Sequence, residues 1–158
     1  MRQFFQRVLV CLPLVAILVV VGCRTTSADL AGAGHMASLT ISGRSEVDIL
    51  RAMEAVFVAN GYQHMGDLTF DKKGSAWETA LYGGWNADGV WIRLKASVDP
   101  GPSGTYVIGC DAFRVTGHNQ GVMEEEKKTT HAYRDECKKI LDEVQARLAQ
   151  GGAGAVQP

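Results

Sequence analysis

Four apolar runs separated by turn-forming residues constrain the fold of this chain more than any other feature. Lys-Lys-Gly, Asp-Gly and Pro-Gly segments stand between the runs, and such residues are strong signals of hairpins and loops. Strands joined by successive hairpins run antiparallel, so the pattern predicts a meander. The predicted strands are Met65–Asp71, Ser75–Trp85, Val90–Val98 and Thr105–Val115.

Two stretches of helical periodicity flank these runs. The first begins at Ser45, with Asp48 three residues later, and ends before Gly61, which suits the positive φ of a helix C-terminus. The second is expected over residues 131–149. Each has one apolar stripe: Ile49, Ala52, Met53, Val56 and Phe57 in the first, and Tyr133, Cys137, Ile140, Leu141, Val144 and Leu148 in the second.

The register of the hairpins assigns the faces of the sheet. Two-residue turns at Lys73-Gly74 and Asp88-Gly89 place the apolar residues of both hairpins on one face, and a slip of one residue would reverse them. Across the longer loop, the predicted neighbours are Leu94 with Cys110 and Val98 with Tyr106 on this inner face, and Arg93 with Asp111 and Trp91 with Phe113 on the outer face.

A further short run, Leu39–Ile41, precedes the first helix and completes the order β-α-β-β-β-β-α. The two helical stripes can be buried together on the apolar face of the sheet. The sequence therefore predicts an α+β two-layer sandwich, in which two helices cover one face of an antiparallel meander of four to five strands.

The N-terminus has the pattern of a signal peptide. Arg2 and Arg7 form a basic flank, and the apolar stretch Val8–Val21 is interrupted only by Pro13. This stretch is shorter than the roughly 20 residues that a membrane-spanning helix needs, but it suits the core of a signal peptide. Its end, Val-Val-Gly-Cys at residues 20–23, resembles the lipobox of bacterial lipoproteins.

This resemblance implies that residues 1–22 are removed and that Cys23 is acylated. Several acyl chains anchor a protein durably, since each buried methylene contributes about 0.8 kcal/mol. Arg24, rather than Asp, after the cysteine implies the outer membrane, with the domain facing the periplasm. The alternative is an ordinary secretory signal or a short uncleaved anchor, in which Cys23 is incidental. The topology is only loosely similar to that of helix-grip-like envelope lipoprotein domains, and topology does not fix function.

Composition divides the rest of the chain. Residues 23–38 are small and polar and predict a tether, 39–150 form one domain, and 151–158 are a tail.

Removal of residues 1–22, which contain Arg2 and Arg7 and no acid, changes the formal charge from −1 to −3. This acidic balance argues against a nucleic-acid partner, because such proteins usually carry a basic stripe.

The cysteines have separate expected roles. Cys11 lies in the signal peptide and Cys23 is the lipidation position, which leaves Cys110 on the inner face of the last strand and Cys137 on the stripe of the last helix. An exported chain favours a disulfide between these two. Two reduced, buried thiols that act as small apolar side chains are the alternative.

No spacing of residues indicates a catalytic, cofactor or metal site. The histidines at 64, 118 and 131 are isolated. His118, within Gly-His-Asn-Gln-Gly, has no matched nucleophile and is expected to be an exposed loop residue. We therefore expect a domain that is not an enzyme and that holds no cofactor or metal.

The outer sheet face is the candidate partner surface, because aromatic residues and arginine are enriched in the cores of interfaces. The alternative is that the first strand or residues 116–130 cover this face within the monomer. The expected function is a lipid-anchored envelope protein with a non-catalytic binding or structural domain, anchored to the membrane through Cys23 and in contact with an envelope protein. The alternatives are a lipoprotein that binds a small ligand or a cell-wall glycan, and an unrecognised envelope enzyme. The candidate surface residues are Tyr82, Trp91, Arg93 and Phe113.

Overall fold

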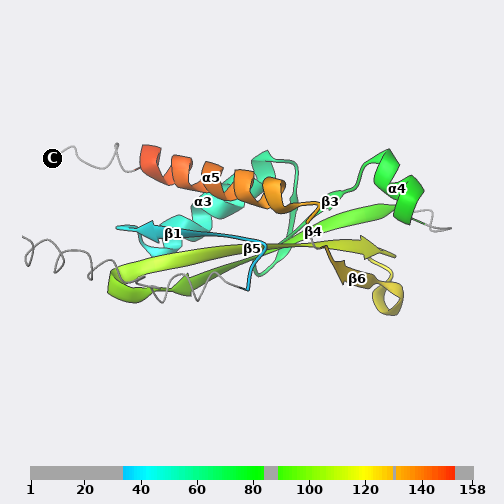
Figure 1. Cartoon of the computed structure of the whole chain (residues 1–158), viewed down its shortest axis with the longest axis horizontal. Coiled ribbons are helices and arrows are strands. Elements are labelled where there is room, and N and C mark those ends of the chain that lie inside the picture. The colour runs from blue at the N-terminus through cyan, green and yellow to red at the C-terminus, as the bar shows by residue number, and fades with distance from the viewer. Residues whose placement is uncertain (1–33, 84–88, 130, 152–158) are drawn as a thin grey trace, which may run out of the picture.

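The computed structural model describes residues 34–83, 89–129 and 131–151, which form an α+β domain (Figure 1). The predicted signal peptide, Cys23, most of the tether, Trp85 and the tail after residue 151 lie outside these residues. The elements in chain order are β1 (Ala37–Ser42), α3 (Glu46–Ala59), β2 (Gln63–Gly66), β3 (Thr69–Lys73), α4 (Ala76–Tyr82), β4 (Val90–Pro100), η1 (Pro102–Gly104), β5 (Thr105–Thr116), η2 (Gly121–Met123), β6 (Glu125–Lys128) and α5 (Arg134–Gly151).

The strands form one antiparallel open sheet in the order β1-β5-β4-β3-β2. β4 and β5 are its long central pair, and they are paired from Val90–Thr116 at one end to Pro100–Tyr106 at the other. β6 also pairs with β5. β1 pairs with the first half of β5 and β6 with its last four residues. We call the end of the sheet at which Val90 pairs with Thr116 the distal end.

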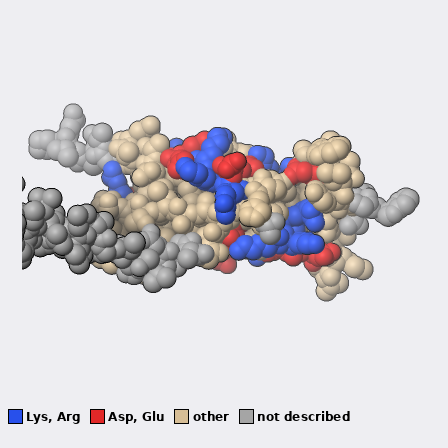
Figure 2. Space-filling model, in the orientation of Figure 1, with Lys and Arg blue, Asp and Glu red and all other residues tan. Residues whose placement is uncertain are grey.

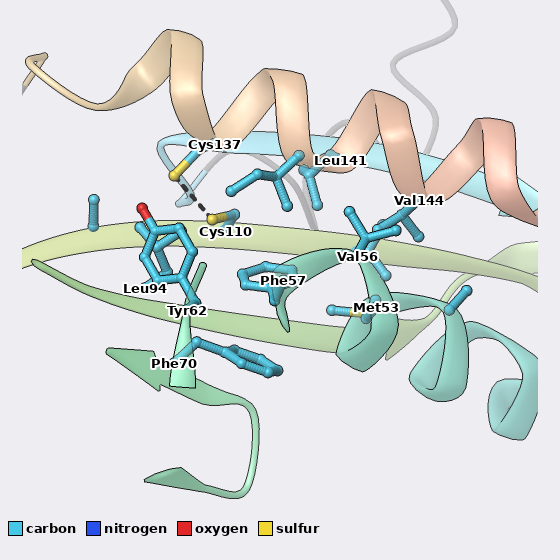
Figure 3. Close-up of a cluster of buried hydrophobic side chains, with 14 of the residues drawn as sticks. Met53, Val56, Phe57, Tyr62, Phe70, Leu94, Cys110, Cys137, Leu141 and Val144 are labelled. Carbon is cyan, nitrogen blue, oxygen red and sulfur yellow. Dashed lines mark hydrogen bonds between the residues drawn. The ribbon is translucent and has the colours of Figure 1, made fainter. Parts of the chain in front are cut away.

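Helices α3 and α5 pack side by side on one face of the sheet, as the sequence predicts (Figures 1 and 3). All five residues of the α3 stripe are buried, and so are five of the six in the α5 stripe. Phe57 of α3 stacks on Phe70 of β3, with ring centroids 4.3 Å apart. The α3 boundaries follow the predicted chemistry: Ser45 caps the N-terminus through the Asp48 N–H, and Gly61 follows the C-terminus at φ 85°.

The predicted strand Ser75–Trp85 is wrong, because Ala76–Tyr82 form helix α4. The Ser75 hydroxyl accepts a hydrogen bond from the Glu78 N–H, and the Glu78 carboxylate accepts one from the Ser75 N–H at 2.6 Å. This reciprocal capping box favours the start of a helix, even though the apolar residues that follow alternate as they would in a strand. No residue of α4 is buried, so local capping rather than burial in the core accounts for the helix.

The predicted strand Met65–Asp71 is instead a hairpin of β2 and β3. Gly66 and Asp67 have φ values of 123° and 46°, and this left-handed backbone reverses the chain. The Met-Gly-Asp sequence therefore forms a turn within a segment that the apolar pattern alone assigns to one strand.

The β4–β5 register differs from the prediction by two residues, because the turn at η1 is shorter than the predicted loop. Val98 lies opposite Ile108, and Arg93 lies opposite Phe113 rather than Asp111. Trp91 likewise lies opposite Val115. A shift of two residues preserves the faces, since side chains alternate with a period of two. The predicted inner and outer faces of these two strands are therefore correct although the predicted neighbours are wrong.

Two segments outside the predicted elements contact the sheet. His35 and Met36, within the expected tether, both bond the Asp111 carboxylate, each at 2.9 Å. Residues 116–130, which lie outside the predicted strands and helices, include β6, whose four residues are all exposed. Among the described residues, no helix combines the length and the apolar character needed to cross a membrane.

Candidate functional site

The four candidate surface residues do not lie on one face. Trp91, Arg93 and Phe113 are on the outer face of β4 and β5, away from α3 and α5. Tyr82 belongs to α4 and lies instead against Arg114 of β5, with the guanidinium carbon 3.9 Å from the ring centroid. The helical conformation of residues 76–82 is the reason, because it removes Tyr82 from the sheet. The surface predicted from the sequence is therefore divided between two places.

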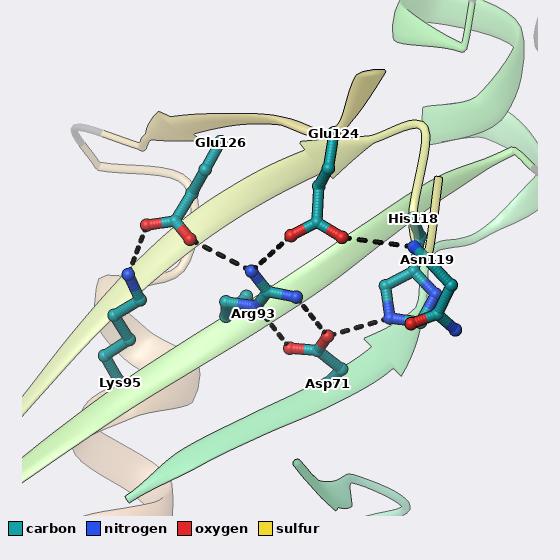
Figure 4. Close-up of polar contacts among 7 residues, drawn as sticks. All are labelled: Asp71, Arg93, Lys95, His118, Asn119, Glu124 and Glu126. Atoms are coloured by element: carbon teal, nitrogen blue, oxygen red, sulfur yellow. Dashed lines mark hydrogen bonds and ion pairs between the residues drawn. The ribbon is translucent and has the colours of Figure 1, made fainter. Parts of the chain in front are cut away.

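Arg93 is the centre of a charged cluster on the outer face (Figure 4). Its guanidinium forms a two-fold contact with Asp71 of β3, from Nε to Oδ1 at 2.8 Å and from Nη2 to Oδ2 at 2.7 Å. Its Nη1 also donates to Glu124 at 2.6 Å and to Glu126 at 3.1 Å. The Asp71 side chain is fully buried, and the Arg93 side chain is 13% exposed. The cluster connects β3 and β4 to the segment after β5.

The surroundings of Arg93 and Glu124 favour the charged forms of these two residues. The hydrogen bond to Asp71 contributes most to raising the pKa of Arg93 above its usual value. Partial burial acts to raise the pKa of Glu124, but the hydrogen bonds from Arg93 and from the Asn119 N–H, together with the positive charge of Arg93, lower it on balance. The ion pair between Arg93 and Glu124 is therefore maintained across the neutral range.

His118 is buried in the same cluster, so the expectation of an exposed loop histidine is wrong. Its Nε2 lies 2.9 Å from Asp71 Oδ2, and its ring stacks on Trp91 at a centroid distance of 3.9 Å. Gly117 and Asn119 have φ values of 66° and 62°, and this left-handed backbone turns the loop back over the sheet. Only 4% of the side chain is exposed, which leaves little of it for contact with a substrate.

Residues 117–126 therefore cover much of the outer face within the monomer, the alternative that the sequence leaves open. They cover Trp91 with His118 and Arg93 with Glu124 and Glu126. Two features of the sequence point toward this arrangement. His118 lies between turn-forming residues, and Asp71 is an acid within a predicted apolar strand. Neither feature alone predicts the contact between His118 and Asp71, because they are distant in sequence.

Cys110 and Cys137 come together between β5 and α5, as the predicted faces require (Figure 3). Both residues are fully buried, and both are thiols in the structure, with the two sulfur atoms 2.9 Å apart. The hydrogen bond between the thiols and their burial raise the pKa of Cys110 far above its usual value. The disulfide stays a prediction, and the proximity on which it depends is present.

The second candidate site is a groove of about 450 Å³ at the distal end, on the same side of the sheet as α5. Helix α4 forms one wall, and its Trp77 is 70% exposed. Figure 2 shows Lys and Arg side chains gathered beside the surface over α4. The residues that define this distal groove are Trp77, Leu81, Tyr82, Arg114, Lys127 and Tyr133.

The distal groove contains an unfavourable pair of charges. Arg114 of β5 lies directly opposite Lys127 of β6 in the antiparallel ladder. Like charges in such positions are destabilising. The neighbouring Lys128 is paired with Asp111 at 2.9 Å, whereas neither Arg114 nor Lys127 forms an ion pair with another described residue. The groove thus combines exposed aromatic rings with two cations that form no ion pair with a described residue, one of which, Arg114, lies over the Tyr82 ring.

Three comparisons, with protein-family models, curated proteins and solved structures, find no match. Within residues 34–83, 89–129 and 131–151, no three or more His, Cys, Asp or Glu side chains are placed to hold a metal ion.

Proposed function

We propose that this chain is a lipid-anchored protein of the bacterial envelope and that its folded domain is a non-catalytic binding module. The anchor is Cys23, at the end of an apolar run that resembles a lipobox. Binding takes place in the distal groove rather than on the outer sheet face, because residues 117–126 occupy much of that face.

The exposure of α4 is the observation that carries the binding role. Trp77, Leu81 and Tyr82 are each at least half exposed, and they lie together along one wall of the groove. Clustered apolar side chains on the surface mark interaction sites more often than scattered ones. Removal of these apolar side chains from water on binding would supply much of the affinity.

A photo-reactive amino acid at position 81 tests the binding role in living cells. We expect an adduct at position 81 and none at position 47, because Val47 is similarly exposed, at 61%, but lies on α3 away from the groove. Equal adduct yields at the two positions would contradict a specific site.

The anchor is tested separately by metabolic labelling with an alkyne analogue of palmitate. Cys23→Ala should lose the label and leave the membrane fraction, whereas the matched control Cys11→Ala should keep both properties. A labelled Cys23→Ala protein would refute the assignment of the anchor.

A further inference from the structure

We infer that the distal groove binds an acidic glycopeptide, a sugar chain that carries a carboxylate-bearing peptide, as in the bacterial cell wall. This inference rests on the proposed function, which places the domain in the envelope. It names the chemistry of the occupant that the groove would take.

The pairing of Arg114 with Lys127 favours an anion, because like charges directly opposite each other repel. These cations are direct neighbours across β5 and β6, and no described acid forms an ion pair with either. Glu78 also lines the groove, but its carboxylate accepts hydrogen bonds from the Ser75 N–H and hydroxyl at 2.6 and 2.8 Å. Glu125 lines a smaller adjoining hollow that shares Tyr82, Arg114 and Lys127. A ligand carboxylate between the two cations would convert a repulsive pair into a charge-assisted contact.

The aromatic residues select a ligand with a flat apolar face. Trp77 and Tyr82 of α4 and Tyr133, which precedes α5, all line the groove, and Tyr133 also packs against the core. Aromatic rings stack on the C–H face of a sugar ring, and Trp77, which is 70% exposed, offers the most accessible such surface in the groove. A volume of about 450 Å³ lies within the range of small-ligand sites, roughly 300–1,000 Å³. Because the rings line a concave groove, an inserted chain fits them better than a flat bilayer does.

Isothermal titration calorimetry of the full chain in mild detergent tests this inference. The probes are disaccharide–peptide fragments of peptidoglycan, the free stem peptide and a neutral tetramer of N-acetylglucosamine. The disaccharide–peptide should bind at least tenfold more tightly than either the free peptide or the neutral glycan, because only it supplies both the ring and the carboxylate.

Two variants locate the binding. Lys127→Glu should weaken binding of the disaccharide–peptide at least tenfold while the melting temperature stays the same or rises, since the acid then faces Arg114. Arg44→Glu, the same charge reversal beyond the opposite end of β5, should change the affinity less than twofold. Trp77→Ala should weaken binding at least tenfold, because the ring that stacks on the sugar is removed.

Every other outcome of these experiments overturns the inference. Equal binding of the free peptide would indicate an acidic protein segment as the occupant, and equal binding of the neutral glycan would remove the role of the cations. If no probe binds at millimolar concentration, the glycopeptide is excluded, while the adduct at position 81 and the label on Cys23 still decide the proposed function.

Discussion

Replacing Arg93 by Gln should destabilise the domain strongly, because this side chain holds the charged cluster of the outer face together. The substitution removes four hydrogen bonds, two of them to Asp71, whose side chain is fully buried. Breaking a buried ion pair by removing one partner costs about 3–5 kcal/mol, because a charge remains buried without compensation. His118 still contacts Asp71 in the variant, so we expect a loss near the lower limit, about 3 kcal/mol.

Urea unfolding monitored by circular dichroism measures this loss. For a domain of this size, about 3 kcal/mol corresponds to a fall of roughly 12 °C in the melting temperature. Lys138→Gln is the control, since it breaks an exposed pair with Asp142 and should cost no more than about 0.5 kcal/mol.

A double-mutant cycle with Asp71→Asn completes the test. The two substitutions should be coupled by more than about 1 kcal/mol, because both remove the same contact. If Arg93→Gln costs less than about 1 kcal/mol, or if the two effects add, the cluster does not hold β3 and β4 to residues 117–126.

Three further predictions concern the rest of the domain. Oxidation of the Cys110–Cys137 pair should raise the free energy of unfolding by about 2–4 kcal/mol relative to the dithiothreitol-treated protein; a Cys137→Ala protein that shows the same response to the reductant would exclude the bridge. Lys127→Glu should raise the free energy of unfolding by about 0.5 kcal/mol, measured in urea, because it replaces a like-charge pair; a loss would show that the repulsion is not felt. Stability should decline as the pH falls below about 5, because the folded-state pKa of Glu124 lies below its unfolded value and protonation therefore favours the unfolded chain. Arg93→Gln should flatten this decline in stability, and an unchanged slope would contradict the role of Arg93.

The sequence predicts the layers of the fold because periodicity and capping are local. The stripe of α3 and its ends at Ser45 and Gly61 are read directly from residue spacing, and the structure confirms them. The faces of β4 and β5 are also correct, since any even register preserves them. The strand predicted over Ser75–Trp85 is wrong because the Ser-x-x-Glu capping box outweighs the alternation of apolar residues.

The candidate site is less accessible from the sequence. The pairing of Arg93 with Asp71, and the return of His118 over Trp91, depend on which strands are neighbours and on a loop with left-handed residues. The distal groove depends on α4 and β6, and the sequence pattern predicts neither element. Residues distant in sequence meet there, and no local spacing signals such a meeting.

Intact-mass analysis of the protein purified from the bacterial envelope tests the lipid anchor, the central claim, most directly. We expect a chain that begins at Cys23 and carries the added mass of acyl chains. A chain that retains residues 1–22, or an unmodified cysteine at position 23, would contradict it.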